Sequence, residues 1–386
     1  MKFVLAVAIL LVRCSLLDAA LWDQISLRGY LRETPILWKA SPDTMGSQTY
    51  RFDNLLHTRQ NLRWHPMTTL RMGFELKTRL LIGESAQDML ALTNMATLVE
   101  PYFCWSRTFV DEEHIVLTSM IDRAWAKWTR GPLEITLGRQ RVAWGTNLVW
   151  NPIDLFNPAL PLDFDSEEKP GNDAARLEWY LGPNSELDVA FVPQRDPDSS
   201  AAAIRLKLNR WEYDWIAIAG RRGPVAVAGF AWAGSIHGGG FRGEALYAMP
   251  RQSSMHEPNY LTLAVSGDYA FRSSLYLHAE VLYKERGTTG NAGRFHLLEA
   301  YRRGELTSAR WALFGEVARD LSPLVRVSGV AILNPSDGSW YLGPTFTLSV
   351  LTNLDFFATA LLFGGDAGTE FGDNSEILMG RLKFSF

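Results

Sequence analysis

The sequence has few of the features that stabilise a secreted soluble protein or anchor a helical membrane protein. It contains 2 cysteines in 386 residues. Cys14 falls in the leader described below, and Cys104 alone cannot build an internal disulfide framework. Beyond that leader, no stretch reaches the roughly 18 apolar residues of a transmembrane helix. Lys and Arg number 38 against 42 Asp and Glu, so no overall basic field favours a nucleic-acid partner.

Aromatic residues and glycine, in contrast, are abundant. The chain has 14 Trp, 12 Tyr, 20 Phe and 31 Gly. This composition is typical of β structure with many turns. It also suits a belt of aromatic side chains at a membrane interface.

Residues 1–20 have the pattern of a secretory signal peptide. Lys2 precedes an apolar run from Phe3 to Val12, and the small residues Ala19 and Ala20 follow. The apolar run is too short for a membrane anchor. We therefore expect cleavage after Ala20 and a single domain over residues 21–386.

Alternation of apolar and polar residues recurs along the rest of the chain, and it indicates strands with two different faces. The segment TLRMGFELKTRL (69–80) puts Leu70, Met72, Phe74, Leu76 and Thr78 on one face and Arg71, Gly73, Glu75, Lys77 and Arg79 on the other. A soluble β-sandwich and a transmembrane barrel both have such strands. The segments run to about ten residues or more, the length that a tilted membrane-spanning strand needs, and this favours the barrel.

The connections between strands differ in length in a regular way. Short turns at 65–68, 130–132, 182–184, 321–323 and 351–353 contrast with long polar connections at 84–117, 142–172, 287–308 and 364–374. Outer-membrane barrels have short periplasmic turns and long external loops. The sequence therefore predicts an all-β fold, a transmembrane antiparallel β-barrel of about 18 strands with an inward-folded loop; 16 strands is the main alternative. The 18 expected strands lie near 25–33, 53–64, 68–83, 118–129, 133–141, 173–182, 186–193, 201–208, 211–220, 225–234, 240–249, 259–270, 274–286, 309–318, 323–333, 339–350, 353–363 and 375–386.

The chain ends within an alternating segment, GRLKFSF (380–386). In a closed barrel the last strand pairs with the first, so we expect Phe386 to point outward in the periplasmic aromatic girdle. A terminal strand that ends in Phe resembles the signal read by the insertion machinery of bacterial outer-membrane barrels. That resemblance implies an assembly role for Phe386.

The segment LGRQRVAWGTNLVWNPIDLFNPALPLDF (137–164) begins as a strand and then departs from the alternation. Its motif GRQRVAWG…WNPIDLFNP resembles a segment of Gram-negative outer-membrane porin-like barrels, among them alginate-export and carbohydrate-porin relatives. In such barrels the loop after a central strand folds inward. The resemblance implies a constriction, or alternatively a plug, over residues 142–172, and it assigns the constriction to Arg139, Gln140, Arg141, Trp144 and Asp154.

Basic residues dominate the polar face of the early strands. The expected pore-lining set is Arg59, Arg63, Arg71, Lys77, Arg79, Arg123 and Lys127, with Arg205 and Lys207 further on and a bulge expected at Gly138. Inward carboxylates are expected mainly on later strands, at Glu178, Glu186, Asp188, Glu212, Glu244 and Glu280. The two sets either neutralise each other or leave a basic wall. In the second case we expect a modest anion preference, and Trp144 stacking on a sugar ring.

These patterns predict an outer-membrane porin for passive diffusion of small hydrophilic solutes, with a preference for acidic or sugar-like ones. Its partners would be the lipid bilayer, the solutes and the insertion machinery; no cofactor or metal is expected. The alternatives are a structurally plugged barrel and a barrel enzyme of lipase or protease type. The sequence has no G-x-S-x-G elbow and no His-x-x-x-His spacing, although a catalytic triad assembled across distant strands would leave no such motif.

Overall fold

The computed structural model describes residues 24–39, 50–87, 102–157, 169–251, 258–291, 293, 307–374 and 376–386. The expected signal peptide lies outside this range. The strands are β1 (Ile25–Lys39), β2 (Tyr50–Met67), β3 (Leu70–Gly83), β4 (Ser106–Glu112), β5 (Ile115–Arg130), β6 (Leu133–Gln140), β7 (Asn172–Tyr180), β8 (Glu186–Val192), β9 (Ala201–Arg210), β10 (Tyr213–Arg222), β11 (Val225–Ile236), β12 (Gly239–Pro250), β13 (Tyr260–Ala270), β14 (Leu275–Lys284), β15 (Trp311–Ser322), β16 (Val325–Leu333), β17 (Trp340–Leu351), β18 (Leu354–Gly364) and β19 (Glu376–Ser385). A short 3₁₀ turn covers Pro197–Ser199. In the described part of the chain, no helix is long and apolar enough to cross a membrane.

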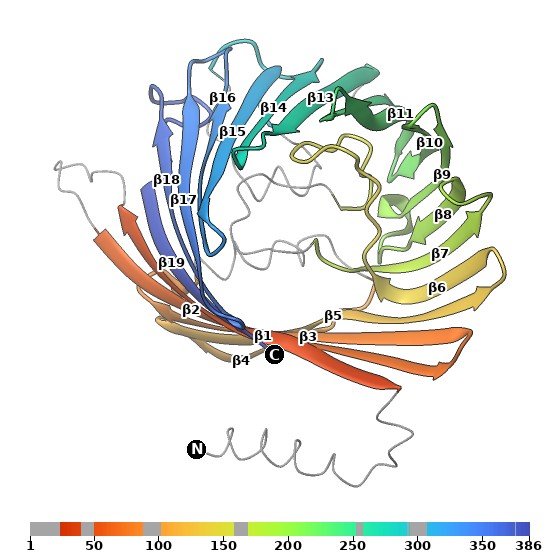
Figure 1. Ribbon diagram of the computed structural model, residues 1–386, viewed down its shortest axis with the longest axis horizontal. Helices are drawn as coiled ribbons and strands as arrows, with labels where there is room; N and C mark the ends of the chain where they lie inside the picture. Colours follow the sequence, from red (N-terminus) through yellow and green to blue (C-terminus); the bar gives the residue numbers. More distant parts are fainter. Residues whose placement is uncertain are drawn as a thin grey trace, which may run out of the picture.

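The strands form one antiparallel sheet that closes on itself (Figure 1). The last strand, β19, pairs with both β18 and β1, and β1 pairs with β2. Among the described strands, β4 pairs with β5 alone, and the other edge of β5 pairs with β3, so β4 is an addition beside the ring. The remaining 18 strands make the barrel. The predicted fold class and strand number are thus confirmed, and the 16-strand alternative is wrong.

The two rims of the barrel differ in the length of their connections. At one rim, here the short-turn rim, two-residue turns join β2 to β3, β5 to β6 and β17 to β18. Trp211 and Glu212 form such a turn with φ of 56° and 64°, as do His237 and Gly238 with 51° and 85°; positive φ at both central residues matches the twist of the paired strands. The strand ends that the long connections join lie at the opposite, long-loop rim. Both the start of β1 and the end of β19 lie at the short-turn rim, as an even strand number requires.

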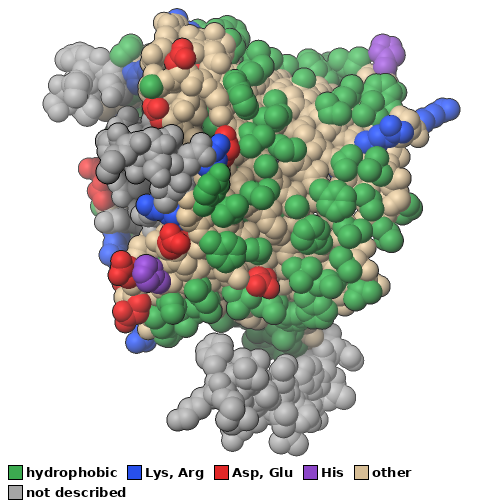
Figure 2. All heavy atoms as spheres, turned by 90° about the vertical axis from the view of Figure 1, so that its left-hand side faces the viewer, with side chains coloured by type: hydrophobic (Ala, Val, Ile, Leu, Met, Phe, Trp, Pro, Cys, Tyr) green, Lys and Arg blue, Asp and Glu red, His purple; other side chains and the backbone are tan. Residues whose placement is uncertain are grey.

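The outer wall of the barrel is apolar. Figure 2 shows hydrophobic side chains spread over the visible outer face, with most of its charged side chains near one end. Bulky residues such as Phe74, Ile82 and Leu378 project from it. On β2, the exposed aromatic residues Phe52 and Trp64 stand near opposite rims. Their 12-residue separation on a tilted strand corresponds to about 30 Å, enough to bracket the apolar band of a membrane barrel.

A β-bulge changes which side chains of β5 face the lumen. In the pairing of β3 with β5, Leu76 is opposite Ile121 and the next residue, Glu75, is opposite Arg123. Asp122 is therefore an extra residue of β5 that has no partner position on β3. Asp122 and Arg123 are both buried on the inner side, because a bulge re-aims a side chain. The bulge expected at Gly138 is absent: β6 keeps a continuous register with β5 and β7 through that residue.

Candidate functional site: the lumen and its inner wall

Residues 141–157 turn into the barrel after β6 instead of extending outward, and Figure 1 shows this segment inside the ring of strands. We call it the inward loop. Its apolar side chains, among them Val142, Ile153 and Phe156, pack on small inward residues of β7–β12 such as Ala190 and Ala231. Alanine at these wall positions leaves the space that the loop fills.

Two carboxylates of the inner wall hold the backbone of the inward loop. Glu244 on β12 accepts hydrogen bonds from the backbone N–H groups of Thr146, Asn147 (3.0 Å) and Ile153 (3.0 Å), and from the Thr146 hydroxyl (3.0 Å). Glu280 on β14 accepts from the N–H groups of Val149 (3.2 Å) and Trp150 (2.7 Å). Both carboxylates are about 1% exposed. The loop thus wraps its own amide groups around two fixed anions, much as a backbone nest binds an anion.

Trp144 is part of this anchorage and does not face the lumen. It is fully buried, and its Nε1 donates to Asp188 Oδ2 at 2.8 Å. The Arg205 guanidinium lies over its ring at 5.6 Å. The expected stacking of Trp144 on a sugar is therefore wrong, because both the ring face and the polar edge are already in use.

The early strands carry a mixed charge cluster in place of a basic strip. Arg59 on β2 donates to Glu75 on β3 and to Asp122 on β5, the latter at 2.7 Å. Arg63 also donates to Glu75, and Arg123 lies 3.4 Å from Glu75 and 3.6 Å from Asp122. Three cations thus share two carboxylates. The expectation that inward carboxylates lie mainly on later strands is wrong here, since Glu75 and Asp122 belong to the same wall.

The charge network continues across β5–β9, where cations and carboxylates alternate. Lys127 contacts Glu134 at 2.6 Å and Glu178 at 3.3 Å, and Arg176 contacts Asp188 at 2.6 Å. The remaining pairs of this network are Arg176–Glu178, Arg205–Glu186, Arg205–Asp188 and Lys207–Glu186. Along these strands the four cations meet four carboxylates, so this part of the wall is neutralised.

Among the described residues, the inner wall around β1–β3 carries an excess of positive charge. Arg32, Lys77 and Arg79 are buried there in addition to the mixed cluster, and the Arg32 guanidinium lies 2.6 Å from His57 Nδ1. Arg71 is exposed near the short-turn rim. The predicted cations of β2, β3 and β5 therefore do share the inner wall, although most of them are buried and engaged with other groups.

Arg139 does not line the lumen. The alternation of β6 places it on the face of Leu137, which is exposed on the outer wall. Its guanidinium forms two hydrogen bonds of 2.9 Å with Asp173 and lies over Trp105 at 5.6 Å. Residues 102–105 cover this pair from outside: Phe103 O accepts from Arg139 and Phe103 N donates to Asp173.

The other predicted constriction residues are separated by the fold. Gln140 is buried and donates to the backbone oxygens of Thr136 (3.0 Å) and Ala174 (3.1 Å), whereas Arg141 is exposed. Asp154 is 2% exposed and pairs with Lys169. Burial raises the pKa of the Asp154 carboxyl, and the Lys169 ammonium opposes that shift. Glu212 lies in a turn at the short-turn rim, not on the inner wall.

Trp125 is an inner-wall aromatic residue that the sequence did not single out. It pairs with Gly73, and a side chain at Gly73 would collide with its indole ring. The Arg63 guanidinium lies 5.4 Å from the centre of that ring. Trp125 lies on the same face of β5 as Arg123 and Lys127, which were expected to line the pore, so the alternation of this strand could have identified it.

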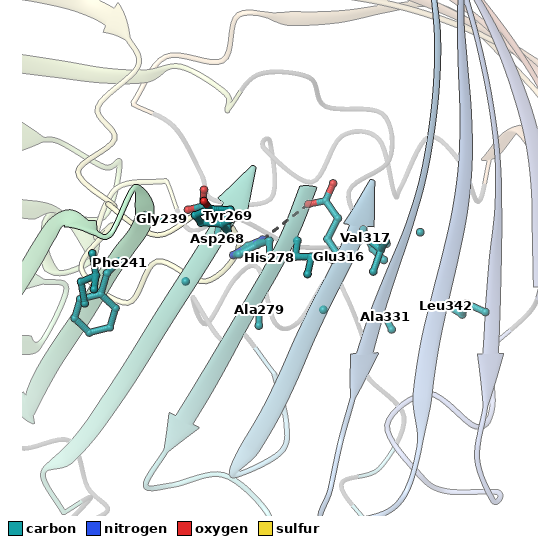
Figure 3. A pocket seen from close by; sticks show the side chains of 17 residues that line it. Gly239, Phe241, Asp268, Tyr269, His278, Ala279, Glu316, Val317, Ala331 and Leu342 are labelled. Carbon is teal, nitrogen blue, oxygen red and sulfur yellow. Dashed lines mark ion pairs between the residues drawn. The ribbon is translucent and has the colours of Figure 1, made fainter. Parts of the chain in front are cut away.

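A hollow of about 810 Å³ extends over β11–β17, and side chains from both faces of the wall line it (Figure 3). Gly267, Ala279, Gly315 and Ala331 are directly paired across four neighbouring strands. Their face is that of the exposed Val281 and Val317, so this row of small residues makes a trough on the outer wall. On the inner face, His278 lies 3.6 Å from Glu280 and 3.9 Å from Glu316.

Phe386 completes the ring closure. Its backbone N–H and C=O exchange 2.9 Å hydrogen bonds with Gly29. Its ring lies over Gly29, where an added side chain would come within 2.7 Å of it. The ring is 52% exposed on the outer wall at the short-turn rim, the place expected for a girdle residue. Its role as an assembly signal stays a prediction.

The described residues contain no group of three or more His, Cys, Asp or Glu side chains that could hold a metal ion. Their acidic and basic groups instead form the paired networks above and the two loop anchors.

A closed 18-strand barrel with an apolar outer wall, a charged inner wall and a loop folded inside has the architecture of outer-membrane barrels. Solved structures of this class match almost the whole chain. OccAB2 of Acinetobacter baumannii has a TM-score of 0.61 at 10% identity, over 96% of this chain and 99% of that one. The outer membrane protein OprD of Pseudomonas aeruginosa has a TM-score of 0.58 at 8% identity, over 94% and 93%. OccK11 (OpdR) of the same species has 0.56 at 11%, over 95% and 96%.

At these identities the likeness establishes the fold. No protein-family model matches the sequence, and no curated protein is similar to it at a significant level. The kinship with alginate-export and carbohydrate-porin barrels remains a prediction.

Proposed function

We propose that the protein is a passive channel of a Gram-negative outer membrane for small hydrophilic solutes. The observation that carries this proposal is the opposition between the two walls of the closed barrel. Phe74 and Ile82 project from β3 outward, while Glu75, Lys77 and Arg79 of the same strand face inward. An apolar exterior suits lipid, and a charged interior in a barrel of this strand number suits an aqueous path.

The proposed solute class is small and acidic or sugar-like. Its support is the excess of cations around β1–β3, since arginine binds carboxylates through two parallel hydrogen bonds. Trp125 beside Arg63 takes the place of Trp144 as the candidate surface for a sugar ring. Because Glu75 and Asp122 offset much of the positive charge, the expected anion preference is modest.

A plugged barrel is the second candidate. The close packing of the inward loop on β7–β12 and its anchorage by Glu244 and Glu280 favour it. A barrel enzyme is a weaker alternative, because the sequence has neither a G-x-S-x-G elbow nor a His-x-x-x-His spacing.

Planar-bilayer recording of the refolded protein distinguishes the candidates. We expect stepwise conductance, and a reversal potential under a salt gradient that indicates modest anion preference. Persistent silence of correctly folded protein would support the plug and overturn the channel. Cation selectivity would leave the channel intact but overturn the acidic solute class.

The orientation is tested on intact cells. Added protease should cut within 84–117, 287–308 or 364–374, the connections between strands that end at the long-loop rim. Cuts at 130–132 or 351–353 would show that the short-turn rim faces outward.

A further inference from the structure

A small pocket lies on the barrel at the long-loop ends of β9, β10 and β11. Its volume is about 300 Å³, and its lining residues are Ala202, Gly220, Arg221, Gly223, Pro224, Ala226 and Arg251. At this point of the long-loop rim, β10 and β11 are joined by the two-residue turn Gly223–Pro224, so no long loop extends from the barrel there. Arg251 is fixed beside the turn by a 2.9 Å hydrogen bond from its N–H to Pro224 O.

The pocket belongs to the outer wall. Arg221 pairs with Ala202 on β9 and with Ala226 on β11. The residues that alternate with these, Ala203 and Val227, are buried against the inward loop. Arg221 and its two alanine neighbours therefore face away from the lumen, and the short alanine side chains leave open space on either side of the guanidinium.

The pocket also lies at the edge of the apolar band of the outer wall that is nearer to the long-loop rim. One step further toward the short-turn rim, the outward positions are occupied by Ile204 and Tyr247, which are 43% and 42% exposed. The Tyr247 hydroxyl accepts a 3.0 Å hydrogen bond from Asn259. An aromatic ring with an apolar body and a bonded hydroxyl is typical of the membrane–water interface. Arg221 and Arg251 thus stand at the depth where lipid headgroups lie.

Arg221 and Arg251 differ from the cations of the inner wall in their partners. Both are exposed, and no described residue forms an ion pair or side-chain hydrogen bond with either guanidinium. The acidic turn beside Gly223 engages the carboxylate of Asp196 itself, which accepts from Asp198 N at 3.1 Å and from Ser199 Oγ at 2.8 Å. Two arginines therefore line a pocket that has no carboxylate among its lining residues.

We propose that this pocket binds the phosphate group of a membrane lipid headgroup. The guanidinium groups of Arg221 and Arg251 would grip the phosphate oxygens, since planar arginine forks match phosphate geometry. The acyl chains would run down the outer wall past Ile204 and Tyr247. Basic side chains at the headgroup level each add appreciable attraction for an anionic lipid. The inference rests on the proposed membrane location.

The test compares lipid binding by the wild-type barrel and by an Arg221→Gln/Arg251→Gln double variant. The probes are detergent micelles containing lipid A, with its two phosphates, or its dephosphorylated form, and bound lipid is counted by native mass spectrometry. We expect the wild type to prefer the phosphorylated lipid and the double variant to bind it at least about tenfold more weakly. The dephosphorylated lipid should bind both proteins equally.

The matched control is Arg272→Gln/Arg319→Gln. These two arginines are also exposed, but they lie at the short-turn rim of β13–β16. The control variant should retain wild-type binding of lipid A. An equal loss in both variants would show a general charge effect and overturn the site, as would equal wild-type binding of the two lipid forms.

A displacement experiment distinguishes a lipid headgroup from free phosphate as the ligand of the pocket. Inorganic phosphate should not displace bound lipid A, because it lacks the acyl chains; displacement at low concentration would overturn the lipid assignment. Bilayer conductance of the double variant should equal that of the wild type, since both arginines face outward. A silent wild type that still binds lipid A through this pocket would defeat the channel proposal while leaving the lipid site standing.

Discussion

Buried carboxylates on two sides of the lumen have different partners. Glu75 and Asp122, on the wall of β3 and β5, are neutralised by arginine side chains. Glu244 and Glu280, on the opposite wall of β12 and β14, are surrounded by backbone N–H groups of the inward loop. An arginine partner sets the local charge of the lumen. A ring of backbone amides fixes the course of a loop, although Glu280 also has the His278 ring at 3.6 Å.

The two kinds of partner also differ in what their removal costs in free energy of unfolding. Removing one partner of a buried ion pair leaves an uncompensated charge, which costs about 3–5 kcal/mol. Removing a carboxylate that accepts from amides releases several charge-assisted hydrogen bonds, each contributing about 1.5–3 kcal/mol. We therefore expect changes at the first wall to affect barrel stability and ion selectivity, and changes at the second wall to affect the position of the loop.

The largest effect is expected for Glu244→Gln/Glu280→Gln. The amide NH₂ groups would face backbone N–H donors, so the inward loop should detach from β12–β14. Single-channel conductance should change clearly, with added current noise, and protease should cut within residues 141–157. Glu316→Gln is the control, because Glu316 faces the same lumen and contacts His278 but not the loop. Unchanged conductance and an uncut loop in the double variant would refute the anchoring role.

The next effect is expected for Glu75→Gln. Arg59, Arg63 and Arg123 would be left with Asp122 as their remaining carboxylate in this cluster, so unfolding in denaturant should be easier by about 3–5 kcal/mol. Adding Arg63→Gln should restore part of the loss, because it removes one uncompensated charge. No rescue in the double variant would show that the cluster is not coupled as its geometry suggests.

A smaller effect is expected on selectivity from Arg63→Gln alone. Arg63 is half-buried on the inner wall beside Trp125, so its loss should shift the reversal potential toward cations. The shift should be modest, because salt screens exposed charges beyond about 8 Å at physiological strength. Arg319→Gln removes the same charge from the outer wall and should have no effect. Equal shifts in the two variants would contradict the assignment of the walls.

The smallest effect concerns a third carboxylate, Glu370, in the loop between β18 and β19. It accepts from Thr307 Oγ1, Ser308 N (3.1 Å) and Asn334 Nδ2 (2.9 Å). Burial raises its pKa, and nearby Asp337 adds to that shift. The folded protein therefore binds this proton more readily than the unfolded chain. Its contribution to stability is present below the unfolded pKa and is lost as pH rises through the raised folded pKa.

Glu370→Gln should remove this pH dependence. The measurement is hydrogen exchange of residues 334–339 and 365–374 at several pH values, corrected for the intrinsic exchange rate. Protection in the wild type should fall as pH rises, and protection in the variant should stay level. Glu376→Gln, at the start of β19, is the control and should behave as the wild type. A pH-independent wild type would show that Glu370 does not control these loops.

The sequence by itself determined the barrel. Alternation along strands of membrane-spanning length, with short and long connections in turn, favours a closed sheet with two chemically different faces over a soluble sandwich. The 18 predicted strands all correspond to strands of the ring, while β4 was missed because it lies within a long connection and pairs only with β5. Such patterns are local, so one chain segment at a time is enough to recognise them.

Only the tertiary structure decided which inward charges meet. A single extra residue in β5 brought Asp122 to Arg59, and the absence of a bulge at Gly138 left Arg139 on the outer wall. Glu244 and Glu280 were expected to face inward, but their hold on the loop joins residues more than 90 positions apart. The hydrogen bond between buried Trp144 and Asp188 likewise joins residues that are far apart in the sequence. Such contacts depend on register, on bulges and on the path of the loop across the lumen, and none of these is encoded in a local period.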